Sequence, residues 1–435
     1  MTRSGPRRRS RRRLAAYIAV QLLVVLVLVE VVVRLAEPHH RGLRMLLRAS
    51  TDTTDFSDAE TLPELMGRTM LGFAPGTVQF GFVLNSRSFR TREYEPGPAR
   101  DRFRVVALGD SFTFASGGLP HEDHWTTVLQ AELGDRAARP VEVLRLGVPD
   151  TGPAFQLRLW QVEASRLAPD AVVLAFFVGN DFVDHQGDRG PFADDGRGLS
   201  ARLASASAAY RALRNLARVA GAGGLAAVDR GEPGPAAPGE PVPGYREAFD
   251  GGLPTFPEGR FLAIEAERMA LCLRSEEAAF EALARRTAAV VGELAAEVEA
   301  SGASFVVMLI PDQYQVAPEL AGAAARTAGR SLADYDLDRP QRVLTAMLEA
   351  SGIQVLDLLP VLRDEAAAAP VYRPRDTHWN ARGNRIAADL LAERLAPSRP
   401  DDRTELFADG LEAGTAAAWS LVSAGENVRP ITVEP

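Results

Sequence analysis

The chain has 435 residues, of which 46% are hydrophobic and 24% charged, so it can bury the core of one large domain or of two ordinary ones. Its net charge is -8 although seven of its first thirteen residues are Arg, which leaves the remainder strongly acidic. Because phosphate binding needs concentrated positive charge, this acidic body argues against nucleic acid as a partner.

An apolar run follows a basic segment, residues 1–13. Residues 14–33 are interrupted only by Gln21 and Glu30, and a helix needs about 20 apolar residues to cross a bilayer. Positive flanks stay in the cytoplasm, so the sequence predicts a single-pass anchor in membrane lipid at residues 14–34, with the rest of the chain outside the cytoplasm. A cleaved signal peptide and a buried core helix are the alternatives. Glu30 is costly in lipid unless it reaches the interface or a partner.

Residues 35–99 form a juxtamembrane and lead-in segment, with a short strand predicted at 77–84. After residue 100, short apolar runs bounded by Gly, Pro or Asp alternate with helical stretches. Continuous apolar runs are typical of parallel strands buried on both faces, and the alternation predicts a parallel α/β sheet. The predicted strands are 103–108, 141–146, 171–178, 304–310 and 353–358, and the predicted helices are about 124–134, 154–166, 268–301, 340–351 and 381–395.

A long insertion, residues 182–260, separates the third predicted strand from the fourth. Its stretch 199–220 carries four large apolar residues on one helical face, whereas 221–258 is rich in Gly and Pro and is predicted to be irregular. The amphipathic part could be a lid over the site, a helix on the membrane surface or a helix packed on the domain. The C-terminal tail, residues 398–435, indicates no function.

Residues that could take part in catalysis follow four of the predicted strands. Ser111 comes in Gly-Asp-Ser after the first strand, Gly147 after the second and Asn180 after the third. Asp376 and His378 follow the fifth. Each residue alone has an ordinary explanation as a helix cap or turn residue. However, the carboxyl ends of parallel strands meet at one edge of a sheet, where ligand crevices form, so the order predicts one shared site.

These residue types fit nucleophilic catalysis at an ester carbonyl. Ser111, at the start of a helix, can attack the carbonyl carbon, and His378 can take the serine proton and return it to the leaving group. Asp376 can orient the imidazole. The backbone N–H groups of Ser111 and Gly147 and the side-chain amide of Asn180 can donate hydrogen bonds to the oxyanion that forms.

The sequence predicts no metal site and no cofactor. The other histidines show no spacing typical of metal ligands. The single cysteine, Cys272, lies in an apolar helical stretch and is predicted to be a buried small side chain rather than a reactive thiol. The five remaining histidines are His39, His40, His121, His124 and His185.

The combination resembles the SGNH/GDSL hydrolase superfamily, which is named for Ser, Gly, Asn and His in four sequence blocks. Ser111, Gly147, Asn180 and His378 match these blocks in order. The resemblance implies a flavodoxin-like three-layer α/β/α sandwich with a five-stranded parallel sheet over residues 100–397. It also implies that the protein hydrolyses or transfers acyl groups on esters.

Three positions depart from the usual blocks. Val178 stands where the third block usually has Gly, Arg145 where the second block often has Asn, and Arg375 where the last block usually has Asp. The Asp-Thr-His-Trp form of the last block is instead similar to alginate-acetyltransferase-like proteins. The segment Asn-Ser-Arg-Ser-Phe-Arg at residues 85–90 resembles the lead-in of membrane-anchored bacterial members.

Three functions are compatible with these residues. The first is an extracytoplasmic, membrane-anchored serine esterase that removes acyl groups, expected to be acetyl, from a cell-envelope carbohydrate or lipid. The second is an O-acyltransferase that moves the acyl group to a polysaccharide, with an integral-membrane protein as acyl donor. The third is a non-catalytic envelope protein with a relic site. Substrate choice is expected to depend on loops, above all the insertion 182–260.

Overall fold

The computed structural model describes residues 59–66, 74–99, 101–184 and 236–395, together with 27–36 and the single positions 17, 21, 25, 207, 209 and 210. About half of the predicted anchor therefore lies outside the described residues, as do the basic segment, most of the amphipathic stretch of the insertion and the C-terminal tail. Among the helices that are described, none is both long enough and apolar enough to span a bilayer.

The core of the fold is a parallel sheet, which has five strands in the described part of the chain. Its order is β4-β3-β5-β6-β7, and each neighbouring pair is parallel. Numbered along the chain, this order is 2-1-3-4-5, the flavodoxin-like arrangement. The prediction of a five-stranded parallel α/β sheet is confirmed. The strands are β3 (Phe103–Gly109), β4 (Val141–Gly147), β5 (Ala171–Phe177), β6 (Ser304–Ile310) and β7 (Gln354–Asp357).

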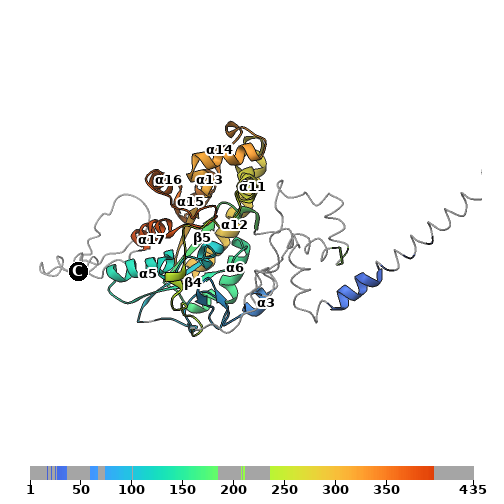
Figure 1. Ribbon diagram of the computed structural model, residues 1–435. Helices are drawn as coiled ribbons and strands as arrows, with labels where there is room; N and C mark the ends of the chain where they lie inside the picture. The colour runs from blue at the N-terminus through green and yellow to red at the C-terminus, as the bar shows by residue number, and fades with distance from the viewer. Residues whose placement is uncertain are drawn as a thin grey trace, which may run out of the picture.

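Helices cover both faces of the sheet, which explains why the strand sequences are largely apolar. Alternate residues of β3 point to opposite faces, so Val106 packs in one apolar cluster and Val105 in the other. The first cluster includes α6, α12 and α15, and the second includes α5, α16 and α17. Figure 1 shows α5 and α17 on one side of β4 and β5, and α6 and α12 on the other. These helices are α5 (Trp125–Arg136), α6 (Pro153–Val162), α12 (Glu277–Ala300), α15 (Arg339–Ala350), α16 (Leu359–Ala366) and α17 (Ala381–Leu395).

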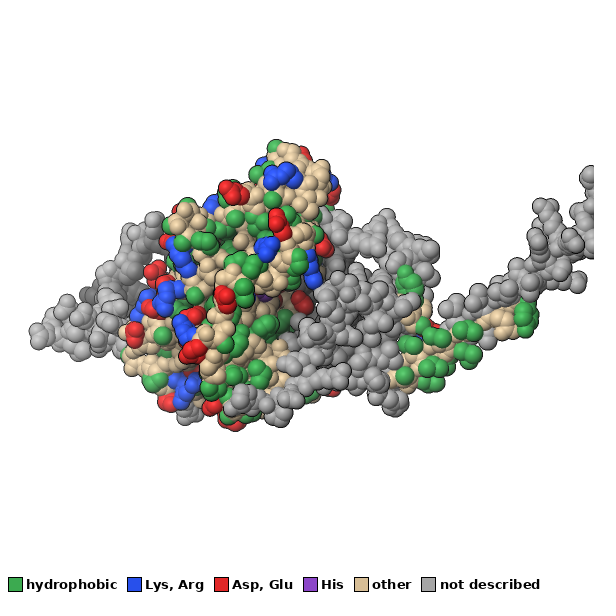
Figure 2. Space-filling model, viewed as in Figure 1, with side chains coloured by type: hydrophobic (Ala, Val, Ile, Leu, Met, Phe, Trp, Pro, Cys, Tyr) green, Lys and Arg blue, Asp and Glu red, His purple; other side chains and the backbone are tan. Residues whose placement is uncertain are grey.

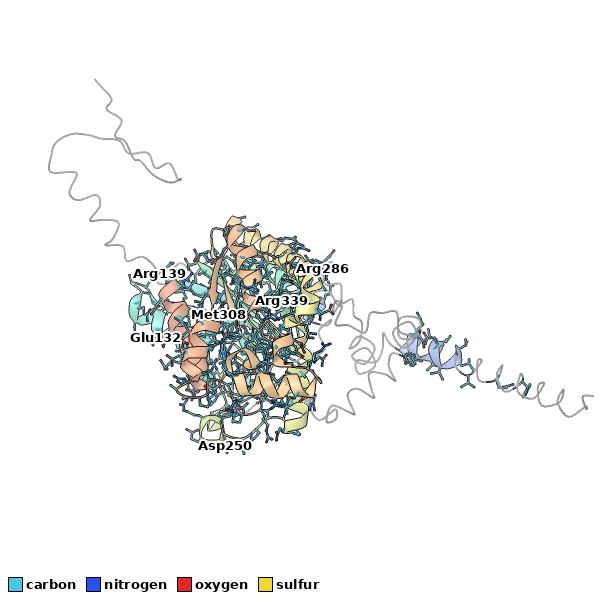
Figure 3. All side chains as sticks on the ribbon, turned by 90° about the horizontal axis from the view of Figure 1, so that it is seen from above. Glu132, Arg139, Asp250, Arg286, Met308 and Arg339 are labelled. Atoms are coloured by element: carbon cyan, nitrogen blue, oxygen red, sulfur yellow. The ribbon has the colours of Figure 1, made fainter. Side chains whose placement is uncertain are left out.

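The view from above makes the same three layers visible. In Figure 3, Met308 of β6 lies in the middle of the folded body, Glu132 of α5 lies at one side and Arg286 of α12 lies at the opposite side. On the face seen in Figure 2, acidic and basic side chains of the described residues are intermixed, without a concentrated basic area.

Two sequence predictions of local structure are wrong. The helix expected over 268–301 begins only at Glu277, and two 3-10 turns precede it, because Leu273 between these turns takes an extended conformation and forms a bridge with Tyr335. The strand expected over 77–84 is a two-stranded hairpin with Phe80 and Gly81 at its turn. The remaining elements are α3 (Leu62–Met66), β1 (Val78–Gln79), β2 (Phe82–Val83), α4 (Ser111–Phe114), α7 (Asp181–Asp184), α10 (Tyr245–Ala248), α11 (Glu258–Arg268), α13 (Gln313–Val316) and α14 (Pro318–Thr327), with 3-10 turns at His121–Asp123, Ala164–Leu167, Met269–Cys272, Arg274–Glu276 and Leu332–Asp334.

The described end of the insertion, residues 236–257, is called the strap below. It contains only the short helix α10 and is otherwise irregular, as its Gly and Pro content predicts. One end of the strap hydrogen-bonds to the hairpin, where Glu240 O accepts from Val83 N at 2.9 Å. The other end reaches the loop before His378, where Thr255 N donates to Pro374 O at 3.2 Å.

Glu30, the charged residue within the apolar run 14–33, has close polar partners. Its carboxylate lies 2.6 Å from Arg34 Nε and accepts hydrogen bonds from Ser207 Oγ at 2.8 Å and Ala209 N at 3.0 Å. The contact links the N-terminal helix to two described positions of the insertion. A carboxylate with such partners costs less in an apolar environment than an isolated one.

Candidate active site

The Gly-Asp-Ser motif makes a tight turn from β3 into the short helix α4. Gly109 has a φ of 155°, and a Cβ there would lie 2.8 Å from Ala175 O, so the turn requires glycine. Asp110 is the N-cap of α4, and its Oδ1 accepts a hydrogen bond from Phe112 N at 2.9 Å. Ser111 is the first residue of the helix and remains partly exposed at the carboxyl edge of the sheet. The sequence therefore presents the Ser111 hydroxyl at a helix N-terminus.

The structure brings Ser111, His378 and Asp376 into one hydrogen-bonded chain. His378 Nε2 lies 2.9 Å from Ser111 Oγ, and His378 Nδ1 lies 2.8 Å from Asp376 Oδ1. The same carboxylate oxygen accepts from the backbone N–H of His378 at 2.9 Å. A serine hydroxyl, an imidazole and a carboxylate thus lie at the distances that acyl transfer by a serine nucleophile requires.

Asp376 is buried and its second carboxylate oxygen is also occupied. Oδ2 accepts hydrogen bonds from Arg373 Nη1 at 3.1 Å and from Thr255 Oγ1. Burial alone would raise the pKa of Asp376, but the hydrogen bond from His378 and its positive charge, together with the hydrogen bond from Thr255, hold that pKa below its ordinary value. Asp376 is therefore ionised at neutral pH and can stabilise a protonated His378.

The loop that follows α4 packs directly against His378. A Cβ at Gly117 would lie 2.8 Å from His378 Cβ, so this approach depends on glycine. The Phe112 ring lies 5.1 Å from the His378 ring, centroid to centroid. A narrow cavity of about 10 Å³ lies beside Ser111 and His378, lined partly by Leu119 and Trp379. A space of that size holds about one water-sized group.

Gly147 lies beside α4, the helix that begins with Ser111. It is in register with Gly109 on the neighbouring strand, and a Cβ at Gly147 would lie 2.3 Å from Phe114 N and 2.5 Å from the carbonyl carbon of Thr113. Glycine is thus required for α4 to sit against β4. The N–H of Gly147 as an oxyanion donor stays a prediction.

Asn180 lies in the turn between β5 and α7, at the same edge of the sheet as Ser111. The backbone carbonyl oxygen of Asn180 accepts from Val183 N at 2.8 Å, and Asp181 Oδ2 accepts from Phe177 N at 2.9 Å. These two hydrogen bonds fix the turn. The side chain of Asn180 is partly exposed. Its amide as an oxyanion donor stays a prediction.

The structure gives physical reasons for two departures from the family blocks. Val178 is buried and its N–H donates to Ile310 O at 3.0 Å, so it continues the sheet. A Cβ at Gly179 would lie 2.3 Å from Asp312 Oδ2, so the glycine of this block stands one position later than usual. Arg145 is buried, and its Nη2 donates to His121 Nδ1 at 2.9 Å.

Arg90 holds the loop after α4 together, a role that its position in the lead-in segment alone did not predict. Its fully buried guanidinium donates to four backbone carbonyls. Burial lowers the pKa of Arg90 to about 10, so the side chain remains charged at neutral pH and stabilises the carboxyl end of α4. The acceptors are the carbonyls of Phe80 at 2.7 Å, Leu119 at 3.2 Å, and Phe114 and Ala115, both at 3.3 Å.

His121, His124 and Cys272 pack against other parts of the fold. His124 is buried at the N-cap of α5, and its Nε2 lies 2.9 Å from Phe112 O, which supports the nucleophile helix. Burial, and then the charge of Arg145, lower the pKa of His121 to about 3. Within the ranges that the structure describes, no three His, Cys, Asp or Glu side chains gather in a way that could hold a metal ion. Cys272 is buried beside Tyr314.

Residues 272–414 match the family model "SGNH hydrolase-like domain, acetyltransferase AlgX". The matched part contains β6, β7 and the loop of Asp376 and His378, but it does not include Ser111. The match confirms the resemblance of the last block to alginate-acetyltransferase-like proteins. None of the curated proteins matches the chain.

Solved structures similar to this chain include esterases. An acetyl xylan esterase, AlAXEase, is 13% identical, covers 67% of this chain and 100% of its own, and has a TM-score of 0.36. The lipase Lip_vut3 from a goat rumen metagenome is 12% identical over 68% of this chain and 99% of its own, with a TM-score of 0.36. A catalytic mutant of Axe2, an acetylxylan esterase from Geobacillus stearothermophilus, is 10% identical over 68% and 97%, with a TM-score of 0.34.

Proposed function

We propose that this protein is a serine esterase of SGNH type that hydrolyses acyl esters, with acetyl as the preferred acyl group. The observation that carries the proposal is the chain of contacts from Ser111 Oγ through His378 to Asp376, at 2.9 Å and 2.8 Å. The narrow cavity beside Ser111 favours a short acyl group, because it has room for about one small group.

The proposed reaction has two stages. Ser111 Oγ attacks the ester carbonyl carbon while its proton passes to His378 Nε2. The bond to the leaving alcohol breaks, the alcohol takes that proton, and the acyl group stays on Ser111. Water then gives a proton to His378 and attacks the acyl carbon. The bond to Ser111 Oγ breaks, the serine regains its proton, and the carboxylic acid leaves.

The developing oxyanion is proposed to accept hydrogen bonds from the N–H groups of Ser111 and Gly147 and from the Asn180 amide. Loss of one such donor typically lowers the rate by about 100- to 1,000-fold. Asp376 does not take the proton in this scheme; it holds the imidazole in the tautomer with a free Nε2 lone pair and stabilises the imidazolium.

The proposed location is the outer face of the cytoplasmic membrane, with residues 14–34 as anchor in membrane lipid. The apolar run and its Arg-rich flank support this orientation. An acylated carbohydrate or lipid of the cell envelope is then the substrate class within reach of the site.

Turnover of p-nitrophenyl acetate by the full chain in detergent tests the proposal. Ser111→Ala should remove activity, whereas Ser351→Ala, at the end of α15, should leave it unchanged. Equal rates for the wild type and Ser111→Ala would show that the serine has no catalytic role. Labelling of the wild type, but not of Ser111→Ala, by a fluorophosphonate probe would separately exclude a non-catalytic protein with a relic site.

The family match supports a second candidate, an O-acyltransferase that moves the acyl group to a polysaccharide. The acyl-serine stage is the same, but a sugar hydroxyl replaces water as the attacking group, and an integral-membrane protein would supply the acyl donor. This candidate predicts an acyl-enzyme that hydrolyses slowly and is discharged faster by added glycan. Fast hydrolysis that no glycan changes would favour the esterase.

A further inference from the structure

The strap supplies a direct contact to the acid of the proposed triad. Thr255 Oγ1 donates to Asp376 Oδ2, the oxygen that does not face His378. Thr255 precedes Asp376 by 121 residues and comes from a segment that the sequence predicts only as irregular. Asp376 Oδ2 has one other donor within the described residues, Arg373, at 3.1 Å. Arg373 Nη1 also donates to Gly117 O, so this one guanidinium nitrogen serves acceptors in two loops.

The backbone of the strap fixes where the Thr255 hydroxyl lies. Thr255 N donates to Pro374 O at 3.2 Å, and the next residue, Phe256, donates through its N–H to Arg375 O at 3.1 Å. Arg375 has a φ of 45°, which is uncommon for a residue other than glycine. These two hydrogen bonds hold the backbone directly before Asp376 in that conformation. The Arg373 guanidinium lies 5.1 Å from the ring centre of Phe249, another strap residue.

The same strap also holds the loop on the Ser111 side of the site. Tyr245 OH donates to Gly118 O at 2.7 Å. The Tyr245 ring occupies the space in which a side chain at Gly81 would lie. Since Gly117 packs against His378, the strap connects the loop after α4 with the loop that carries Asp376 and His378. In Figure 3, Asp250 of the strap lies at the outer edge of the folded body, which fits a segment that wraps the site from outside.

We propose that Thr255 is a positioning residue for acyl transfer and that the strap is a required part of the site. The inference rests on the proposed function, because it assigns Thr255 a role in orienting Asp376 and through it His378. Without the Thr255 hydroxyl, Asp376 Oδ2 keeps one donor among the described residues, Arg373 Nη1, which also donates to Gly117 O, so the carboxylate is held less firmly against the imidazole. Misplacement by about 1 Å costs on the order of 100-fold in rate. Thr255 is solvent-exposed, so water can replace its hydroxyl in part, and the effect expected is about tenfold.

The test compares three variants of the full chain in detergent. Thr255→Val keeps the shape of the side chain and removes the hydroxyl, Thr255→Ser keeps the hydroxyl, and Thr327→Val, on α14, is the matched control. Thr255→Val should lower kcat about tenfold with KM within about twofold, whereas Thr255→Ser and Thr327→Val should stay close to wild type. A kcat for Thr255→Val within about twofold of wild type, or no recovery in Thr255→Ser, would overturn the proposal.

A second measurement does not depend on turnover, so it separates this inference from the proposed function. In protein labelled with ¹⁵N-histidine, the ring nitrogens of His378 are assigned by their loss in His378→Gln. Thr255→Val should shift or broaden these signals, while Thr255→Ser and Thr327→Val should not. If the wild type turned over no ester but this pattern appeared, only the proposed function would fail. Unchanged His378 signals in Thr255→Val would remove the positioning role.

Discussion

Replacing Gly147 with Ala tests whether the glycine of the second sequence block is needed for β4 to pack against α4. The new Cβ would lie 2.3 Å from Phe114 N and 2.5 Å from the carbonyl carbon of Thr113. Both are backbone atoms, so no side-chain rotation can relieve the contact. The substitution keeps the backbone N–H that is proposed to donate to the oxyanion, so it perturbs geometry without deleting a donor.

The expected magnitude follows from these distances. Ordinary van der Waals contact begins at 3.4 Å, so α4 must move by about 1 Å relative to β4. Overpacking of this kind costs about 1 to 3 kcal/mol, which corresponds to a fall in Tm of about 2 to 10 °C. Because Ser111 begins α4, the same shift moves its Oγ away from His378 Nε2. A displacement of about 1 Å at the nucleophile lowers kcat about 100-fold.

The assay measures Tm and p-nitrophenyl acetate kinetics for Gly147→Ala beside Gly292→Ala. Gly292 lies inside α12, and a Cβ there would have no neighbour within 4 Å. Alanine is the better helix former by roughly 0.5 to 1 kcal/mol, so the control should be as stable as wild type or more so. A Gly147→Ala protein with the Tm and kcat of wild type would refute the packing argument.

Three further predictions concern buried groups. Arg90→Lys should lower Tm by several degrees and kcat about tenfold, because an ammonium cannot serve four carbonyls arranged around a planar guanidinium; an unchanged Tm would contradict this. Asp376→Asn should lower kcat about 1,000-fold or more. Since the folded-state pKa of Asp376 is depressed, its contribution to stability is present at neutral pH and is lost as pH falls below about 4, so the Tm difference between wild type and Asp376→Asn should shrink there. Burial raises the pKa of the Cys272 thiol to about 12, so Ellman's reagent should react with it only after unfolding, and fast labelling of the folded protein would be inconsistent with this burial.

The strands and the three residues of the proposed triad could be predicted from the sequence because both depend on local signals. A strand buried on both faces is largely apolar along its length, and on that basis the sequence predicts β3, β5 and β6 to within one residue at each end. Ser111 follows β3 with one residue between them, whereas His378 comes after β7 and the helix α16. The topology of a parallel sheet brings the carboxyl ends of its strands together without any knowledge of side-chain contacts.

The contacts that complete the site could not be predicted in this way. Thr255 is one threonine in a stretch without secondary structure, and nothing local relates it to Asp376. The break between α11 and α12 also depends on a distant partner, since Leu273 pairs with Tyr335. The sequence predicts a helix from residue 268 onward, so it misses the two 3-10 turns before Glu277.

The altered blocks do not have the character of a decaying site. Each departure has at least one local contact. At position 179 the Asp312 carboxylate leaves no room for a side chain, so glycine is needed there. Arg145 donates to His121, and the backbone oxygen of Arg375 accepts a hydrogen bond from the strap. Burying Arg145 is costly, because desolvation and the nearby charge of Arg90 both lower its pKa. Ser111 Oγ nevertheless lies 2.9 Å from His378 Nε2, a geometry that supports the proposed acyl-transfer site over a relic.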